Sequence, residues 1–159
     1  MLSRFPCAYL CFAVLACLAG AATTLTAAPR GELSLRDAEI VAEKWPEARV
    51  NPSGLRYMVL KEGDGPTPRP RQRLTVLYKG SLLDGTEFSA RQDPANPFVF
   101  RLGAGEVIMG WEEAFAEMQV GEKRILIIPF ALGYGLRGNP PSIPNRATLV
   151  FEVELLAIE

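Results

Sequence analysis

The chain has 159 residues, of which 17 are basic and 18 acidic, so its formal net charge is −1. This length suits one domain with a substantial core plus a short additional segment, and the charge balance provides no large electropositive surface for nucleic acid. There is no histidine, which excludes Ser/His/Asp and Cys/His catalysis and every histidine-ligated metal site.

Residues 1–28 have the layout of a secretory signal peptide. Arg4 is the only charge before Arg30, an apolar run covers residues 8–22, and small residues follow that run. The run is short for a membrane span, which needs about 20 residues, so an uncleaved anchor is the less favoured alternative. Cleavage would leave a chain without cysteine, because all three cysteines precede it: Cys7, Cys11 and Cys17. We therefore expect an exported, periplasmic protein.

A second feature of the N-terminus gives an alternative location. The sequence Val14-Leu15-Ala16-Cys17 loosely resembles a bacterial lipobox, in which the cysteine is lipidated and becomes the new N-terminus. Leu15 is a poor fit where a small residue is usual. A lipid on Cys17 would anchor the protein to a membrane, and the signal peptide or this lipid is the only membrane contact that we expect.

Residues 29–52 form a polar extension with one short predicted helix. Ser34 can cap its start, with Asp37 three residues later as a weaker version of the capping box, and Pro46 ends the apolar stripe. A dimer arm is one interpretation, but a helix laid on the following domain, or a mobile leader, is favoured by the short length. Turn residues 51–54 mark the boundary, so the main domain is assigned to residues 53–159.

The main domain has the apolar patterns of strands, which alternate with polar residues except in the near-continuous apolar run at 124–128. Such patterns occur in six segments: 55–60, 74–78, 86–88, 98–100, 124–128 and 147–157. The connector before the second segment carries Arg69, Arg71 and Arg73 and is interpreted as a solvated loop without a nucleic-acid role. Residues 130–146 are too rich in glycine and proline for regular structure and predict a long ordered loop, a kind of loop that is usually functional.

One short helix is expected between the fourth and fifth segments. Trp111, Ala114, Phe115 and Met118 recur at helical spacing, and Gly121 stops the run. Trp111 is either a core residue or the floor of a pocket at the start of the helix. Four to six strands and one helix predict an α+β fold, in which a twisted antiparallel sheet wraps around one short helix.

The order and spacing of several motifs resemble the FKBP-type peptidyl-prolyl cis-trans isomerases, the macrolide-binding rotamases. The motifs are Thr75-Val76-Leu77-Tyr78-Lys79-Gly80, Leu83-Asp84-Gly85-Thr86-Glu87-Phe88, Pro97-Phe98-Val99-Phe100, Val107-Ile108-Met109-Gly110-Trp111, Gly133-Tyr134-Gly135 and Ala147-Thr148-Leu149-Val150-Phe151. The resemblance covers roughly residues 53–159. The lead-in 53–57 is similar to exported bacterial members, including the macrophage infectivity potentiator type, but the extension here is too short for their dimerisation arm.

The resemblance implies a proline-binding pocket with the Trp111 indole as its floor. Its implied catalytic residues are Tyr78, Phe88, Ile108, Trp111, Tyr134 and Phe151, and its further substrate-binding residues are Phe98, Glu106, Val107 and Ile143. Tyr134 and Ile143, on the long loop, would close one side of the pocket. In the family, the hydroxyl of the tyrosine matching Tyr134 and the amide matching Ile108 donate hydrogen bonds to ligand carbonyls. The backbone carbonyl of Glu106 is a further acceptor.

This sequence departs from the family at one wall of the pocket. Family members usually have aspartate directly after the phenylalanine matching Phe88, and here the residue is Ser89. Tyr78 would then lack its usual acidic neighbour, unless Asp93, four residues further along, takes that role. This departure bears on macrolide affinity and on the level of activity.

The implied function is acceleration of X–Pro isomerisation in exported proteins, which assists their folding. Rotation about this bond has a barrier of ~20 kcal/mol and needs no nucleophile, metal or cofactor, and none is expected. The expected partners are proline-containing polypeptides and macrolides. The alternative is a proline-peptide-binding chaperone module with weak or no turnover, which Ser89 favours; a third interpretation makes the aromatic residues core only.

Overall fold

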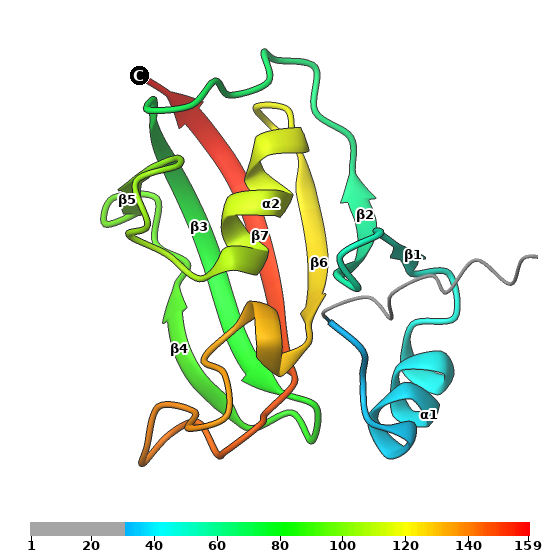
Figure 1. Cartoon of the computed structure of the whole chain (residues 1–159). Coiled ribbons are helices and arrows are strands. Elements are labelled where there is room, and N and C mark those ends of the chain that lie inside the picture. The colour runs from blue at the N-terminus through cyan, green and yellow to red at the C-terminus, as the bar shows by residue number, and fades with distance from the viewer. Residues whose placement is uncertain (1–30) are drawn as a thin grey trace, which may run out of the picture.

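The computed structural model describes residues 31–159 (Figure 1). The predicted signal peptide and the candidate lipidation site at Cys17 lie outside these residues. Within the described part of the chain, no helix is both long and apolar enough to cross a bilayer.

A single antiparallel sheet forms the body of residues 31–159. Its strands are β1 (Arg49–Val50), β2 (Arg56–Lys61), β3 (Arg73–Leu82), β4 (Glu87–Arg91), β5 (Phe98–Arg101), β6 (Lys123–Ile128) and β7 (Leu149–Ile158). The order is β1-β2-β6-β7-β3-β4, and β5 pairs with β3. The predicted α+β class is confirmed. The predicted four to six strands are confirmed for residues 53–159, which contain the six strands β2–β7. The additional strand β1 belongs to the N-terminal extension and has only two residues, too few to show a period.

The short helix α2 (Met109–Glu117) lies across one face of this sheet (Figure 1). Trp111, Ala114 and Phe115 point into the core, together with Met118 just after the helix. The long strands β3 and β7 supply the opposite side of the core through their alternate residues. Each large apolar side chain that is fully buried here stabilises the fold by about 1.5–3 kcal/mol.

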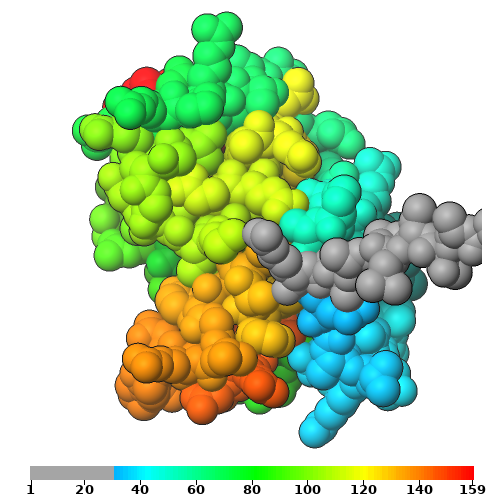
Figure 2. All heavy atoms as spheres, in the orientation of Figure 1, coloured from blue at the N-terminus to red at the C-terminus, as the bar shows by residue number. Residues whose placement is uncertain are grey.

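The N-terminal helix α1 (Leu35–Lys44) lies on the domain (Figure 2). This agrees with the favoured interpretation of the extension as a helix laid on the following domain. The Asp37 amide donates to Ser34 Oγ at 3.1 Å, so Ser34 is the predicted cap. The second half of the capping box is absent there, because the Asp37 carboxylate accepts a hydrogen bond from Thr148 Oγ1 at 2.7 Å instead. Lys44 Nζ donates to the Leu83 carbonyl at 2.6 Å, so both ends of α1 are tied to the domain.

The loop at 130–146 contains more regular structure than its composition predicts. It begins with the 3-10 helix η1 (Phe130–Leu132), and a β-bridge joins Asn139 to Ile143. The bridge has a hydrogen bond in each direction, at 2.9 and 3.0 Å between backbone N and O. These contacts make the loop compact. Its residues 130–146 (orange) pack below α2 in the space-filling view (Figure 2).

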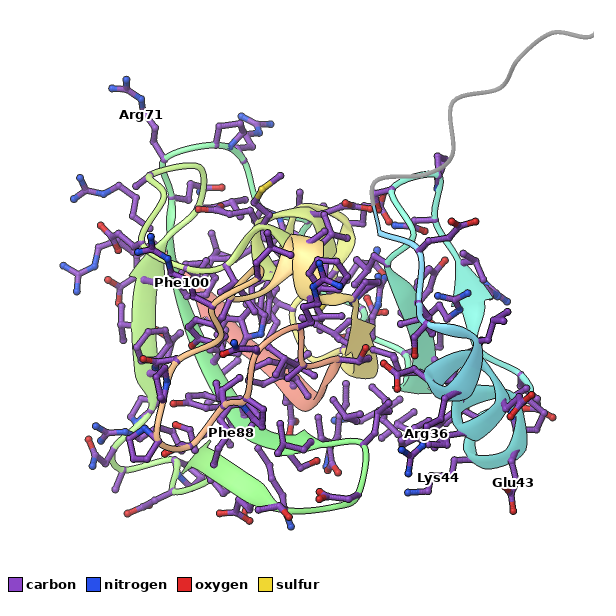
Figure 3. The ribbon with its side chains drawn as sticks, turned by 60° about the horizontal axis from the view of Figure 1, so that its bottom comes forward. Arg36, Glu43, Lys44, Arg71, Phe88 and Phe100 are labelled. Atoms are coloured by element: carbon purple, nitrogen blue, oxygen red, sulfur yellow. The ribbon has the colours of Figure 1, made fainter. Side chains whose placement is uncertain are left out.

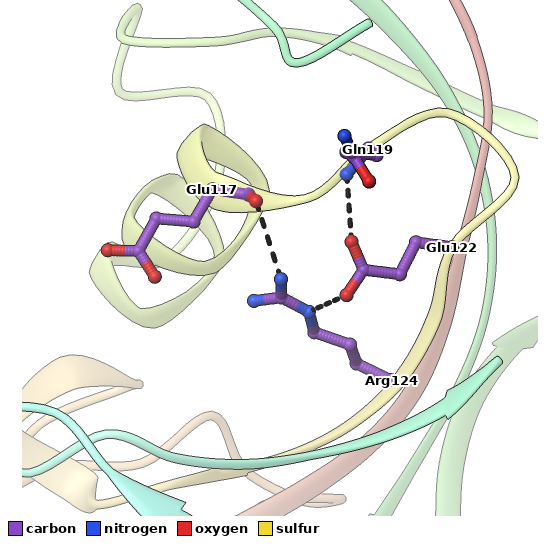
Figure 4. Close-up of polar contacts among 4 residues, drawn as sticks. All are labelled: Glu117, Gln119, Glu122 and Arg124. Carbon is purple, nitrogen blue, oxygen red and sulfur yellow. Dashed lines mark hydrogen bonds and ion pairs between the residues drawn. The ribbon is translucent and has the colours of Figure 1, made fainter. Parts of the chain in front are cut away.

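A buried ion pair fixes the C-terminal end of α2 to β6 (Figure 4). Arg124 donates through Nε to the Glu122 carboxylate and through Nη2 to the Glu117 carbonyl at 3.4 Å. Glu122 also accepts from the Gln119 amide at 2.8 Å. Because Glu122 is 2% exposed and Arg124 8% exposed, neither charge has water as an alternative partner.

We expect Glu122→Gln and Arg124→Met each to lower the free energy of unfolding by about 3–5 kcal/mol, because each leaves one buried charge without its partner. Urea unfolding followed by tryptophan fluorescence measures this. The matched control is Lys123→Met, which breaks the more exposed neighbouring ion pair with Glu152 and should change stability by less than about 1 kcal/mol. Equal losses for the buried and exposed pairs would contradict the assignment.

Candidate functional site

An open cavity of about 280 Å³ lies beside the first turn of α2. It is lined by Tyr78, Phe88, Ser89, Phe98, Gly105, Glu106, Val107, Ile108, Trp111, Tyr134 and Phe151. The structure thus brings together nine of the ten site residues named from the sequence. Ile143 is the exception: it is 2% exposed and packs in the core cluster, because the bridge to Asn139 turns the loop at that point.

The Trp111 indole is the centre of an aromatic cluster that forms the cavity floor. Its ring centroid lies 5.1 Å from Tyr78, 5.2 Å from Phe151 and 5.9 Å from Phe98, all in edge-to-face arrangements. On its other sides it contacts Phe100 and Phe115 in the core. Edge-to-face pairs of this kind add about 0.5–1.5 kcal/mol each beyond the burial of their area. The two interpretations of Trp111 therefore both apply: it is core and it lines the cavity.

The Trp111 side chain also carries a polar group that lacks a protein partner. Its Nε1–H is buried, and no acceptor for it occurs among residues 31–159. A buried donor without a partner costs about 1–3 kcal/mol, and a carbonyl or water that reaches it would recover that energy.

The Tyr78 hydroxyl forms its hydrogen bond with Ser89, at 2.8 Å between the two oxygens. Asp93, the alternative acidic neighbour, accepts through Oδ1 from the Ala95 amide at 2.8 Å and so forms a local Asx turn. In this structure the partner of Tyr78 is therefore the neutral serine. Sequence reasoning named Ser89 as a departure but did not count it among the site residues.

Acidic side chains shape the loop that leads into α2. The Glu112 carboxylate accepts from the amides of Gly103 at 2.6 Å and Gly105 at 3.1 Å, and Glu106 accepts from the Arg101 amide at 2.9 Å. Sequence reasoning did not count Glu112 among the site residues. Glu112 lies nine and seven residues after the two glycines, and these intervals match no repeat of a helix or a strand. The sequence pattern therefore could not predict the contact.

Tyr134 forms the open side of the cavity and is 39% exposed. Burial raises the pKa of its phenol above the ordinary value of 10.0, with a smaller effect from the nearby Tyr78. The hydroxyl therefore stays protonated, and able to donate a hydrogen bond, throughout the neutral pH range.

Gly80 on β3 leaves the space that two walls of the cavity occupy. A Cβ atom at this position would lie 2.6 Å from Phe151 Cε1 and 2.8 Å from Phe88 Cε2. Gly80 is opposite Ser89 on one neighbouring strand and Phe151 on the other, so both rings fold over it. A glycine within a predicted strand is the sequence signal for such a close approach.

We expect Gly80→Ala to displace the rings of Phe88 and Phe151 and to destabilise the protein by about 1–3 kcal/mol, because the added methyl group has no free space. NMR signals of the phenylalanine side chains and urea unfolding measure the two effects. Gly85→Ala is the control, since its added Cβ meets no atom within 4 Å and only its φ of 92° is strained. Unmoved ring signals in Gly80→Ala would refute the steric role.

Comparisons with known proteins agree with this geometry. Residues 65–156 match the family model described as FKBP-type peptidyl-prolyl cis-trans isomerase. The chain is 60% identical over 86 residues to peptidyl-prolyl cis-trans isomerase FKBP2 of Homo sapiens, a match covering 54% of this chain but only 61% of that protein. It is 45% identical over 107 residues to Fkbp12 of Drosophila melanogaster, covering 67% of this chain and 99% of that protein.

A solved structure agrees as well. The crystal structure of AtFKBP13 superposes with a TM-score of 0.68 at 34% sequence identity, covering 71% of this chain and 99% of that chain. The family model alone matches more than half of the sequence. The chain therefore belongs to the family of FKBP-type peptidyl-prolyl cis-trans isomerases.

Proposed function

We propose that the protein accelerates the cis–trans isomerisation of X–Pro bonds in polypeptides by binding the prolyl ring over Trp111. The observation that carries this proposal is the cavity itself: its floor and walls are aromatic, it is large enough for a prolyl ring, and it is open to a chain that passes through. Family membership supports the same reaction.

The mechanism follows from the electronic structure of the amide bond. The planar amide is resonance-stabilised and strongly dipolar, whereas the twisted transition state has lost resonance and much of that dipole. An aromatic, water-poor cavity stabilises the less dipolar state relative to the planar one, and such differential binding lowers the barrier. No bond to the protein has to form or break.

Polar groups around the cavity hold the flanking carbonyls of the substrate. We assign the Tyr134 hydroxyl and the Ile108 amide as donors to these carbonyls and the Glu106 carbonyl as an acceptor. Ile108 suits this role because it is the N-cap of α2 and its side chain provides no cap, so backbone donors at this helix start are directed out of the helix. The unpartnered Trp111 Nε1–H is a further candidate donor.

We expect Trp111→Leu to lower kcat/KM for a prolyl peptide about 10- to 100-fold, because it removes an aromatic contact of about 1.5–3 kcal/mol from the floor. A protease-free isomerisation assay measures this loss. Trp45→Phe, at the C-cap of α1, should leave turnover unchanged. In the Trp45→Phe protein, emission reports Trp111 and should change when a prolyl peptide binds.

The second candidate function is a chaperone module that binds proline-containing segments with weak or no turnover. The neutral hydrogen bond between Tyr78 and Ser89 favours it, since that bond holds the wall less firmly than a bond to a carboxylate. The same assay decides between them: binding without acceleration of the exchange would replace isomerisation with the chaperone function.

Ser89 also sets the expected affinity for macrolides of the FK506 type, which we propose as ligands of the cavity. Ser89→Asp should raise this affinity, because a hydrogen bond to a charged acceptor is worth about 1.5–3 kcal/mol against about 0.5–1.5 for a neutral one. Tyr78→Phe should cancel most of the gain. Calorimetry measures both, and Asp93→Ala is the control, because its carboxylate is occupied by Ala95. A loss of affinity in Asp93→Ala would restore Asp93 as the partner.

We propose in addition that the protein acts in an exported, periplasmic compartment, where it assists the folding of other exported chains. The support is the charge and hydropathy pattern of residues 1–28. Intact mass of the protein from its native source tests this. A full-length N-terminus would refute cleavage, and a diacylglycerol mass on Cys17 would replace it with a lipid anchor.

A further inference from the structure

Three arginines gather where the start of β3, the end of β5 and the C-terminus meet. A hollow of about 540 Å³ at this place is lined by Arg71, Arg73, Arg101, Gly103, Ala104 and Glu159. We call Arg71, Arg73 and Arg101 the arginine cluster. It lies outside the aromatic cavity, and the proposed reaction does not use it.

The strand register forces two of these charges together. Arg73 on β3 and Arg101 on β5 are directly opposite each other in an antiparallel pair, so their Cβ atoms are about 5 Å apart on one face. Like charges in this arrangement are destabilising. The inward face is filled by their neighbours Leu74 and Phe100, which are buried, so both arginines project outward.

The third member is held beside them by the backbone. The Arg71 amide donates to the Leu102 carbonyl at 2.8 Å, and Arg71 adopts a φ of 74°, which is uncommon for a residue other than glycine. Its side chain projects away from the body of the molecule into solvent (Figure 3). Backbone strain and like-charge repulsion both destabilise the folded protein at this place, and such features are typical of binding sites.

Acidic residues do not neutralise the cluster. Among residues 31–159, none of the four ion pairs includes Arg71, Arg73 or Arg101. Of the nearby acids, Glu106 is engaged with the Arg101 backbone amide, and Glu159 lines the hollow without forming an ion pair with these arginines. Three arginines against the one carboxylate side chain of Glu159 leave the lining of the hollow net positive, on a chain whose net charge is −1.

The hollow and the aromatic cavity are separate, and a third depression shares lining residues with each of them. A smaller depression lined by Arg73, Val99, Phe100, Arg101 and Glu106 shares two residues with the arginine cluster and Glu106 with the cavity. Phe98 lines the cavity, and Arg101, three residues later on β5, belongs to the cluster, about 10 Å away along the strand at ~3.3 Å per residue. Their side chains lie on opposite faces of β5, so one polypeptide reaches both by passing over this strand. An extended polypeptide covers the same distance with about three residues.

We infer that the arginine cluster is a second contact site for the substrate polypeptide and binds a carboxylate side chain about three residues from the proline. This inference rests on the proposed function, and it assigns acidic proline-containing segments as the preferred substrates. A polypeptide fits better than a membrane or a nucleic acid, because the arginines line a hollow rather than a flat surface, and the depression beside it shares Glu106 with the cavity.

The test compares peptides that contain one proline and differ only by Glu or Gln three residues away, with one such pair for each side of the proline. For one of the two pairs, kcat/KM should be about three- to tenfold higher for the Glu peptide at low ionic strength. The ratio should fall towards one at 0.5 M salt, where the Debye length is only about 4 Å. It should also fall towards one in Arg73→Gln/Arg101→Gln.

The matched control is Arg36→Gln/Lys44→Gln, an equal loss of two charges on α1, which lies on the opposite side of the molecule from Arg71 (Figure 3). Its Glu/Gln ratio should equal that of the unmodified protein. A ratio near one for both peptide pairs, or a ratio that the double variant leaves unchanged, would overturn the inference. The inference would also be overturned if the Glu/Gln ratio is one and the protein instead binds phosphatidylserine vesicles or a single-stranded oligonucleotide, with this binding lost in Arg73→Gln/Arg101→Gln.

Failure of the proposed isomerase function can be distinguished from failure of the arginine-cluster inference. If no peptide is isomerised, the enzymatic proposal fails, and the ratio of Kd values from calorimetry on the same peptides still tests the cluster. A Kd ratio of about three- to tenfold that is lost in Arg73→Gln/Arg101→Gln would support it, and a ratio near one would refute it.

Discussion

The Trp111 indole has to satisfy two requirements at once, and the rest of the site depends on how it does so. It is 4% exposed and contacts five other aromatic rings, yet one of its surfaces is the floor of an open cavity. Because the rings of Phe100 and Phe115 support it from the core side, the floor cannot sink when the cavity is empty. A preformed apolar surface of this kind needs little rearrangement when a ligand binds.

Holding the floor in place requires that both ends of α2 are fixed, and polar contacts do this where the apolar core cannot. At the start, Glu113 accepts from Asn51 at 2.9 Å and from Ser53 at 2.6 Å, while Glu112 holds the incoming loop. These carboxylates are also favoured by the positive end of the helix dipole. At the far end, the Arg124 guanidinium meets the negative end of the dipole and the Glu117 carbonyl. A nine-residue helix would be marginal without such contacts.

Sequence patterns located the elements and the apolar lining because both follow from local periodicity and from the order of motifs. Alternation, one near-continuous apolar run at 124–128 and the turn signal at 84–85 identified six of the strands, and the helical spacing from Trp111 to Met118 identified α2. The contacts that were missed join distant residues with no repeating interval: Asp37 with Thr148, Glu112 with Gly103, and both rings with Gly80. Ile143 was misplaced for the same reason, since only the three-dimensional course of the loop shows that its side chain enters the core.

The distribution of charge around the site separates two tasks. Inside the cavity the polar partner of Tyr78 is a neutral serine, and Glu106 is the only residue with a charged side chain in the lining that the structure describes. An apolar cavity recognises the prolyl ring by shape and cannot distinguish the charges of the residues that flank it. Selection among substrates by the charge of these flanking residues must then come from protein groups outside the rim of the cavity. Such groups act in high dielectric, so they tune the choice among substrates by modest factors without altering the low-polarity environment in which the bond rotates.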